Sequence, residues 1–168
     1  MLVKKLEIER KFLLKGMPSE QPLDIIDIDQ WYLKNKYGIW ERARTWNSDL
    51  NGLKWIHTIK TPISKGIQEE VERDLTEEEF DKFVKKCKLK TEESRFITKQ
   101  RWIYPIEKEL YWEVDMFDTG HHLVVAEIEL PKKNTKFTTP EFIREKILIE
   151  VTGMKQFSNK NLSNKLIK

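Results

Sequence analysis

The chain has 168 residues, enough for one domain with a core of ordinary size. Hydrophobic residues make up 39% and aromatic residues 11%, which argues against a disordered chain. Charged residues make up 35%, but 31 basic and 28 acidic residues leave a formal net charge of only +3. This balance does not mark a nucleic-acid coat or a membrane-surface protein, so the positions of the charges carry the information.

Cysteine content and hydropathy set the expected location. The one cysteine, Cys87, cannot form an intrachain disulfide and is interpreted as a buried, unreactive thiol. The first residues lack the apolar core of a secretory signal, and no run approaches the roughly 20 apolar residues of a membrane span. We therefore expect a soluble, cytoplasmic protein in which residues 1–168 form a single domain.

Most of the chain alternates apolar and polar residues with the period of two that is typical of β-strands. Turn signals separate these segments, including Pro62 to Gly66, Lys108 and Thr119-Gly120. The predicted strands are residues 3–13, 26–34, 37–46, 53–61, 67–75, 95–104, 110–117 and 123–130. A sheet of this length rarely stays open, so it is expected to curl toward a barrel within an antiparallel α+β domain.

Helices are predicted at three places. Thr76 followed by three glutamates is typical of an N-cap and an acidic first turn. Downstream, Phe80, Phe83 and Cys87 can form one apolar stripe. A second helix is predicted from about Pro140 to Leu148, and a last short one within Asn159 to Ile167.

Charged residues fall on one parity of the predicted strands, and the signs are segregated. The first strand, within KLEIERKFLL, places Glu7, Glu9 and Lys11 on alternate residues, so they point the same way. The later strands carry mostly bases or mostly acids on one parity: Arg42 and Arg44; Lys60; Glu70, Glu72 and Asp74; Lys99 and Arg101; Glu113 and Asp115; Glu127 and Glu129.

One such strand is ordinarily a solvated face, but the series indicates something else. Solvated faces mix signs, whereas neighbouring like charges cost energy unless an opposite charge lies between them. Pairs of acids then indicate a bound divalent cation, and pairs of bases indicate a bound polyanion. Because so many charged groups cannot be buried in a dry interior, we expect them to line a water-filled tunnel. Carboxylates suit Mg²⁺ or Mn²⁺, whereas the cysteine and histidine clusters that zinc requires are absent. There is also no glycine-rich phosphate loop, so side chains would have to bind the phosphate.

The ordered motifs resemble those of the triphosphate tunnel metalloenzymes, also called the CYTH superfamily, and most of all its small bacterial inorganic triphosphatase-like members. Glu7-x-Glu9-x-Lys11 resembles the opening signature of that family, and the charged pairs above resemble its later motifs in order. Glu150-Val151-Thr152-Gly153 with Phe157 to Ser163 resembles its C-terminal signature, so the likeness covers nearly the whole chain. It implies an eight-stranded antiparallel β-barrel, or tunnel, with helices packed outside and a C-terminal helix.

The resemblance also implies a function, namely metal-dependent hydrolysis of inorganic triphosphate to diphosphate and phosphate inside the tunnel. The implied substrate-binding residues are Lys11, Arg42, Arg44, Lys60, Lys99 and Arg101, of which Lys11, Lys99 and Arg101 would act in catalysis. One Mg²⁺ or Mn²⁺ would be held by Glu7, Glu9 and Glu129, and a second by Glu70, Glu72, Asp115 and Glu127. The expected partner is a small-molecule triphosphate, without membrane or nucleic acid, and the expected state is a monomer or homodimer.

Two departures from the family pattern and several alternatives stay open. Gln68 stands where small members often have an arginine, and Lys146 to Ile149 replaces a turn containing tryptophan and glycine. A thiamine or other organic triphosphatase needs an aromatic pocket, for which the candidates are Trp31, Tyr32, Trp40, Trp46 and Trp55. A class IV adenylyl cyclase and a non-catalytic polyphosphate-binding module are further alternatives; a pure binder would not need so many acids. A glycosidase would leave the bases unexplained.

Overall fold

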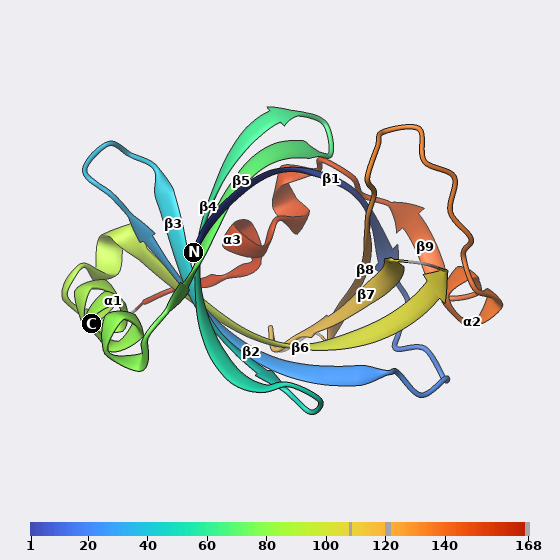
Figure 1. Ribbon diagram of the computed structural model, residues 1–168, viewed down its shortest axis with the longest axis horizontal. Helices are drawn as coiled ribbons and strands as arrows, with labels where there is room; N and C mark the ends of the chain where they lie inside the picture. The colour runs from blue at the N-terminus through green and yellow to red at the C-terminus, as the bar shows by residue number, and fades with distance from the viewer. Residues whose placement is uncertain (108, 120–121, 167–168) are drawn as a thin grey trace.

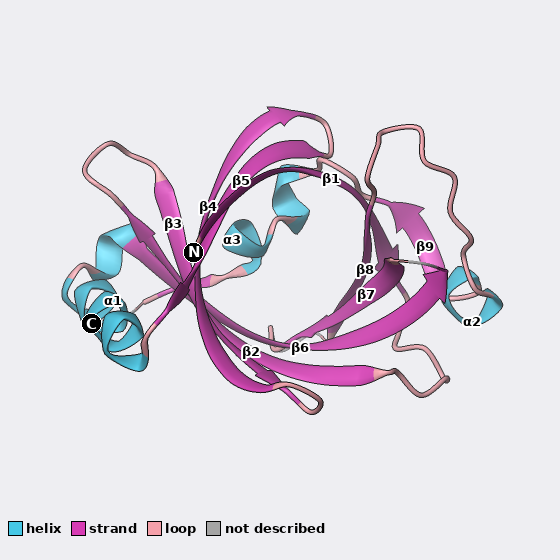
Figure 2. Ribbon diagram, in the orientation of Figure 1, coloured by secondary structure: helices cyan, strands magenta, loops and turns pink. Residues whose placement is uncertain are grey.

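Eight antiparallel strands close into a barrel in the computed structural model, which describes residues 1–107, 109–119 and 122–166 (Figures 1 and 2). The order around the barrel is β6-β2-β3-β4-β5-β1-β8-β7, and pairing of β7 with β6 closes it. The strands are β1 (Leu2–Leu14), β2 (Asp24–Lys34), β3 (Trp40–Ser48), β4 (Gly52–Ser64), β5 (Ile67–Leu75), β6 (Ser94–Glu107), β7 (Leu110–Phe117) and β8 (Leu123–Glu129). This architecture confirms the predicted antiparallel barrel.

Short elements surround the barrel. Helices α1 (Glu77–Leu89) and α2 (Glu141–Arg144) lie outside it on opposite sides, whereas α3 (Asn159–Leu162) lies within its outline in Figure 1. The remaining elements are the 3₁₀ turns η1 (Thr91–Glu93) and η2 (Lys155–Phe157) and the strands β9 (Ile147–Glu150) and β10 (Asn164–Lys165). Strand β9 pairs with β1, and β10 pairs with β6.

The predicted strands match the observed ones closely, and a last short helix begins at Asn159 as predicted, but the helix predicted from Pro140 is longer than the one observed. Helix α2 ends at Arg144, and Ile147 to Glu150, which was predicted to be partly helical, pairs with β1 instead. Hydrogen bonding to a strand far away in the sequence therefore overrides the local helical preference. The last helix is only four residues long. The turn residues predicted at Lys108 and Gly120 lie outside the described residues.

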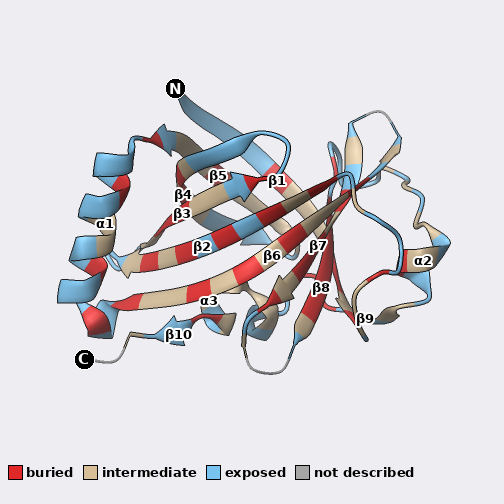
Figure 3. Cartoon of the chain, turned by 90° about the horizontal axis from the view of Figure 1, so that it is seen from below, coloured by how far each residue is buried: buried red, intermediate tan, exposed pale blue. Residues whose placement is uncertain are grey.

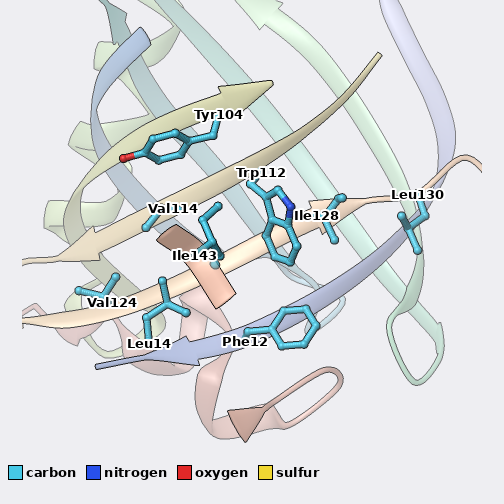
Figure 4. Packing of buried hydrophobic residues seen from close by; sticks show 10 residues of the cluster. Phe12, Leu14, Tyr104, Trp112, Val114, Val124, Ile128, Leu130 and Ile143 are labelled. Atoms are coloured by element: carbon cyan, nitrogen blue, oxygen red, sulfur yellow. The ribbon is translucent and has the colours of Figure 1, made fainter. Parts of the chain in front are cut away.

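The largest apolar cluster lies on the outer face of the barrel, beneath the segment that carries α2 and β9. Trp112 and Ile143 are fully buried, and the Phe12 ring packs 5.5 Å from the Trp112 ring (Figure 4). Ile8 packs against the same cluster. Because Ile8 and Phe12 face outward, the opposite parity of β1, with Glu7, Glu9 and Lys11, faces inward, as the charge pattern predicts.

A second outer cluster forms beneath α1, which Figure 3 shows alongside the barrel. The Thr76 hydroxyl accepts a hydrogen bond from the Glu79 amide, and the Glu79 carboxylate accepts one from the Thr76 amide, so a capping box begins the helix. Phe80 then packs with Ala43 and Leu75 of the barrel wall, and Trp31 and Trp55 border this cluster. These two tryptophans therefore belong to the outer core and do not line the lumen.

Cys87 of α1 is fully buried, and burial raises the pKa of its thiol to about 11. Because only the thiolate reacts with disulfide reagents, we expect the native protein at about pH 8 to react far more slowly than the urea-unfolded chain. The measurement is the rate of labelling by an aromatic disulfide, with the unfolded chain supplying the full one-thiol end point. Equal rates for the folded and unfolded protein would contradict this prediction.

A candidate active site in the barrel lumen

The strand register gathers the predicted site residues on the inner face of the barrel. Residues opposite each other on antiparallel strands point to the same face. Lys60 lies opposite Glu70, Arg101 opposite Asp115, and Lys11 opposite Glu127. The inner face carries every predicted ligand: Glu7, Glu9, Lys11, Arg42, Arg44, Lys60, Glu70, Glu72, Lys99, Arg101, Asp115, Glu127 and Glu129. Most of these side chains are buried, although Glu129 is exposed.

Asp115 holds two bases at the centre of one side of the lumen. Its carboxylate accepts hydrogen bonds from Lys99 Nζ at 2.5 Å and from Arg101 Nε at 2.7 Å and Nη2 at 2.8 Å. Burial alone would raise the pKa of Asp115, but Arg101 and Lys99 together lower it. Lys99 is also fully buried, and burial with the nearby Arg101 lowers the pKa of its ammonium to about 8. Arg101 additionally pairs with Glu113.

A second ion-paired group forms where β1, β4 and β5 meet. Lys60 Nζ lies 2.6 Å from Glu7 Oε2 and 3.1 Å from Glu70 Oε2, so one base links two predicted metal ligands. Gln68 donates from Nε2 to the same Glu7 oxygen at 2.6 Å. Gln68 thus faces the lumen, but in this structure it binds a carboxylate, a role that its neutral amide can fill.

Arg42 and Arg44 lie next to each other with unused hydrogen-bond donors. Arg42 Nη2 donates to the Thr58 hydroxyl at 3.0 Å, and Arg44 Nη2 donates to Glu72 at 3.2 Å. The Nε of each guanidinium is buried without an acceptor among the residues that the structure describes. Burial, followed by repulsion from Arg42, lowers the pKa of Arg44 to about 10. Buried donors without partners are uncommon in proteins, and here they fit the oxygens of a bound anion.

Glu9 is the carboxylate that fits a cation best. Burial and repulsion from Glu127 raise the pKa of Glu9 to about 7. Lys11 Nζ lies 3.5 Å from the Glu9 carboxylate but only 2.9 Å from that of Glu127, so this base pairs more closely with Glu127. Glu9 also lies directly opposite Glu129. Within the described ranges no three acidic, histidine or cysteine side chains form a ready-made metal cluster. The reason is that lysine or arginine pairs with most lumen carboxylates, so Glu9 is the place where oxygen ligands fit a hard divalent cation.

The raised pKa of Glu9 predicts a pH dependence of stability in metal-free protein. Since the folded state binds this proton more tightly than the unfolded state, the contribution of Glu9 is fully present below about pH 4.5 and is lost as the pH rises through about 7. We expect Glu9→Gln to flatten this part of the pH profile, measured as the free energy of unfolding in urea with EDTA. Glu92→Gln, on the exposed turn after α1, is the matched control. Identical profiles for wild type and Glu9→Gln would contradict the prediction.

The candidate aromatic residues divide between the two faces of the barrel. Tyr32, Trp40 and Trp46 share the inner face with Arg42 and Arg44. The Trp46 ring is faced by the Arg44 guanidinium at 4.8 Å and by Lys54 Nζ at 5.4 Å. At the Trp40 end of β3, Tyr32 of the neighbouring strand β2 joins the buried residues Ile97, Phe117 and Val125, against which Trp40, Leu123 and Leu162 of α3 pack. Helix α3 therefore closes one end of the lumen, and we refer to this apolar cluster as the plug.

Sequence reasoning missed Lys5 as a lumen residue. Lys5 Nζ lies 3.0 Å from Glu129 and 3.5 Å from Glu70, so it links carboxylates that were predicted to bind different metal ions. These acids raise the pKa of Lys5 although burial opposes them. The signal was present in the sequence, because Lys5 has the same strand parity as Glu7.

A closed antiparallel barrel whose inner face carries segregated bases and acids defines the class of tunnel proteins that bind polyanions. No family model matches the chain. It is 31% identical over 158 residues to an inorganic triphosphatase of Acetivibrio thermocellus, covering 93% of this chain and 92% of the relative. The chain belongs to the triphosphate tunnel metalloenzyme, or CYTH, superfamily.

Solved structures support the fold. The inorganic triphosphatase NE1496 matches with a TM-score of 0.60 at 23% identity, covering 95% of this chain and 99% of that one. The HpAC1 protein of Hippeastrum, described as a putative adenylyl cyclase with a dominant triphosphatase activity, matches with a TM-score of 0.55 at 16% identity, covering 75% and 80%. The PH1819 protein of Pyrococcus horikoshii OT3 matches with a TM-score of 0.54 at 18% identity, covering 76% and 80%. Among the described residues, no helix is both long and apolar enough to span a membrane.

Proposed function

We propose that this protein hydrolyses inorganic triphosphate to diphosphate and phosphate in the barrel lumen, with Mg²⁺ or Mn²⁺. The observation that carries the proposal is the pair of buried guanidinium groups, Arg42 and Arg44, whose Nε donors have no protein acceptor. Because carboxylates lie on the same inner face as these guanidinium groups, the lumen can bind an anion and a cation together. The 31% identity to a protein named inorganic triphosphatase supports this choice among triphosphates.

The basic residues have different roles in binding the substrate. Arg42 and Arg44 have free donors and would anchor a phosphate group directly. Lys60, Lys99 and Arg101 pair with carboxylates in this structure, so a bound triphosphate would compete with Glu7 and Asp115 for them. Lys11, Lys99 and Arg101 would then stabilise the charge on the phosphoryl group in the transition state. Since these donors are already oriented, little reorganisation is needed during the reaction.

The carboxylates would hold the cation. We propose Glu7, Glu9 and Glu129 as the first set of ligands, centred on Glu9 because its basic neighbour, Lys11, lies 3.5 Å away and is closer to Glu127, at 2.9 Å. Glu70, Glu72 and Glu127 would serve a second ion, whereas Asp115 is assigned to positioning Lys99 and Arg101, since both its oxygens accept hydrogen bonds from them. When bound, Mg²⁺ or Mn²⁺ supplies positive charge against the phosphate oxygens and makes an attacking water more acidic.

The test is phosphate release from inorganic triphosphate with Mg²⁺, with Mn²⁺ and with EDTA. We expect activity that requires a divalent cation and that is lost in Glu9→Ala, while Glu92→Ala, on the exposed turn after α1, retains it. Activity that is unaffected by EDTA or by Glu9→Ala would overturn the metal model. Tight binding of triphosphate without turnover, measured by calorimetry, would favour a polyphosphate-binding module instead.

An organic triphosphatase is the second candidate, favoured by the position of Trp46 on the inner face beside Arg44. An aromatic ring there could stack on the organic group of thiamine triphosphate or ATP while the bases bind its phosphates. We expect inorganic triphosphate to be the better substrate in a panel of the three compounds, because Arg44 and Lys54 already face the Trp46 ring. A higher kcat/KM for an organic triphosphate, lost in Trp46→Leu, would favour the alternative. The proposed location is the cytoplasm.

A further inference from the structure

The inner face of the barrel becomes basic again beyond the apolar plug. Inner-face residues along β6 run from the lumen bases Arg101 and Lys99 to the plug residue Ile97 and then to Arg95. Strand β2 repeats the pattern, because Tyr32 of the plug is followed on the same face by Lys34. The two strands thus carry a second set of bases at the closed end. Along β6, Ile97 separates Arg95 from Lys99, whereas Tyr32 lies directly opposite both Arg95 and the lumen residue Arg42.

The C-terminal segment adds two lysines to this end. Lys160 lies on α3, and its Nζ is 5.4 Å from the centre of the Trp40 ring, which the Arg95 guanidinium also faces at 5.6 Å. Trp40 lies directly opposite Lys34 on the neighbouring strand. Partial burial, followed by the charges of Arg95, Lys34 and Lys155, lowers the pKa of Lys160. Arg95 and Lys160 therefore face one tryptophan, Lys34 lies opposite it, and Lys155 is near enough to Lys160 to affect its pKa, so the four cations come from four elements.

These four cations have no counter-charge in the part of the chain that the structure describes. None of Lys34, Arg95, Lys155 and Lys160 forms an ion pair there, although most lumen bases do. The Arg95 Nε atom is moreover buried without an acceptor. Like charges held this close repel one another, and a buried donor without a partner costs free energy. Both costs disappear if a multivalent anion binds among them.

We propose that Lys34, Arg95, Lys155 and Lys160 form a second anion site, at the closed end of the barrel, that binds a phosphate-type anion such as diphosphate. Three or four cations match the charge of diphosphate, and arginine can bind two of its oxygens at once. Because Lys160 and the plug residue Leu162 share α3, an anion that links Lys160 to Arg95 would also hold the plug against the barrel wall. The site does not depend on the proposed triphosphatase activity.

The test is calorimetric titration with inorganic diphosphate, without metal, of wild type and three double variants. Lys155→Gln/Lys160→Gln removes half of the new site, Arg42→Ala/Arg44→Ala disables the lumen, and Lys85→Gln/Lys86→Gln on the exposed face of α1 is the matched control for lost charge. In the lumen-disabled protein we expect one remaining site, and adding Lys155→Gln/Lys160→Gln should weaken it about tenfold or more. The control pair should change the dissociation constant little.

A spectroscopic measurement locates the site. Diphosphate added to the lumen-disabled protein should shift the indole N–H resonance of Trp40, assigned by its absence in Trp40→Phe, more than that of Trp112 in the outer core. A long-chain polyphosphate that binds and shifts Trp40 while diphosphate does not would identify the natural ligand as a longer chain. No shift of Trp40 with either anion, or equal affinity with and without Lys155 and Lys160, would overturn the proposal. Phosphate release by Lys155→Gln/Lys160→Gln tests the proposed enzyme separately.

Discussion

Replacing Asp115 with alanine is expected to lower the free energy of unfolding by about 3–5 kcal/mol. Asp115 is fully buried and accepts hydrogen bonds from both Lys99 and Arg101, and the Lys99 side chain is itself completely enclosed. Removing the carboxylate leaves two buried cations that repel each other, since Arg101 already lowers the pKa of Lys99. The measurement is urea denaturation of the purified protein without metal or phosphate.

Two further variants separate this effect from the general cost of losing an acid. Asp118→Ala lies three residues away at an exposed position after β7 and should change stability little. Adding Lys99→Met to Asp115→Ala should recover part of the loss, because Lys99 is the base that this change leaves without an ion-pair partner among the described residues, whereas Arg101 keeps Glu113. A loss of stability below about 1 kcal/mol for Asp115→Ala would show that water solvates these two bases and that they do not depend on Asp115.

Replacing Arg42 with methionine is expected to lower kcat/KM for inorganic triphosphate by about 10²–10³, the typical cost of losing one oriented donor to transition-state charge. The same change should leave the protein as stable as wild type or more stable. Arg42 forms no ion pair among the described residues, its Nε lacks an acceptor, and its charge lowers the pKa of Arg44. A loss of activity without a loss of stability is expected for a buried cation whose role is to bind a ligand.

The matched control is Arg73→Met, which removes an arginine on β5 whose guanidinium pairs with Glu79 at the surface. This variant should keep wild-type kcat/KM and lose little stability, since exposed ion pairs contribute little. Addition of triphosphate should raise the melting temperature of wild type and Arg73→Met but not that of Arg42→Met. If Arg42→Met is strongly destabilised but keeps normal kcat/KM, Arg42 stabilises the barrel and does not bind the substrate.

Strand parity explains why so much of the site was predictable. Segregated charges at a period of two place Glu7, Arg42 and Lys99 on one face of their strands, and only the closed barrel turns that face inward. The same rule places Trp40 and Trp46 beside Arg42 and Arg44 on β3. It does not place Trp31, because Asp27 and Asp29 share the outward parity of Trp31 on β2. The outer packing of Phe12 also follows from parity.

The partners within the site could not be predicted in the same way. Which acid binds Lys99 depends on the register between β6 and β7, and side-chain periodicity alone does not fix that register. The helix predicted to extend to Leu148 ends early because Ile147 to Glu150 pairs with a strand more than 130 residues away. The basic group around Trp40 depends on where α3 lies against the barrel, which is a tertiary contact with no local signal.

The pairing of β1 has a consequence for folding kinetics. This strand pairs with β5, β8 and β9, so Glu9 lies opposite Glu129 and Phe12 opposite Glu150, contacts that span most of the chain. Such long loops must close before their contacts add stability, which makes folding slow compared with that of helical proteins of the same size. The barrel can close only when the far ends of the sequence meet. Pulsed hydrogen exchange during refolding should therefore show amides of the β3–β4 hairpin protected before those of β1.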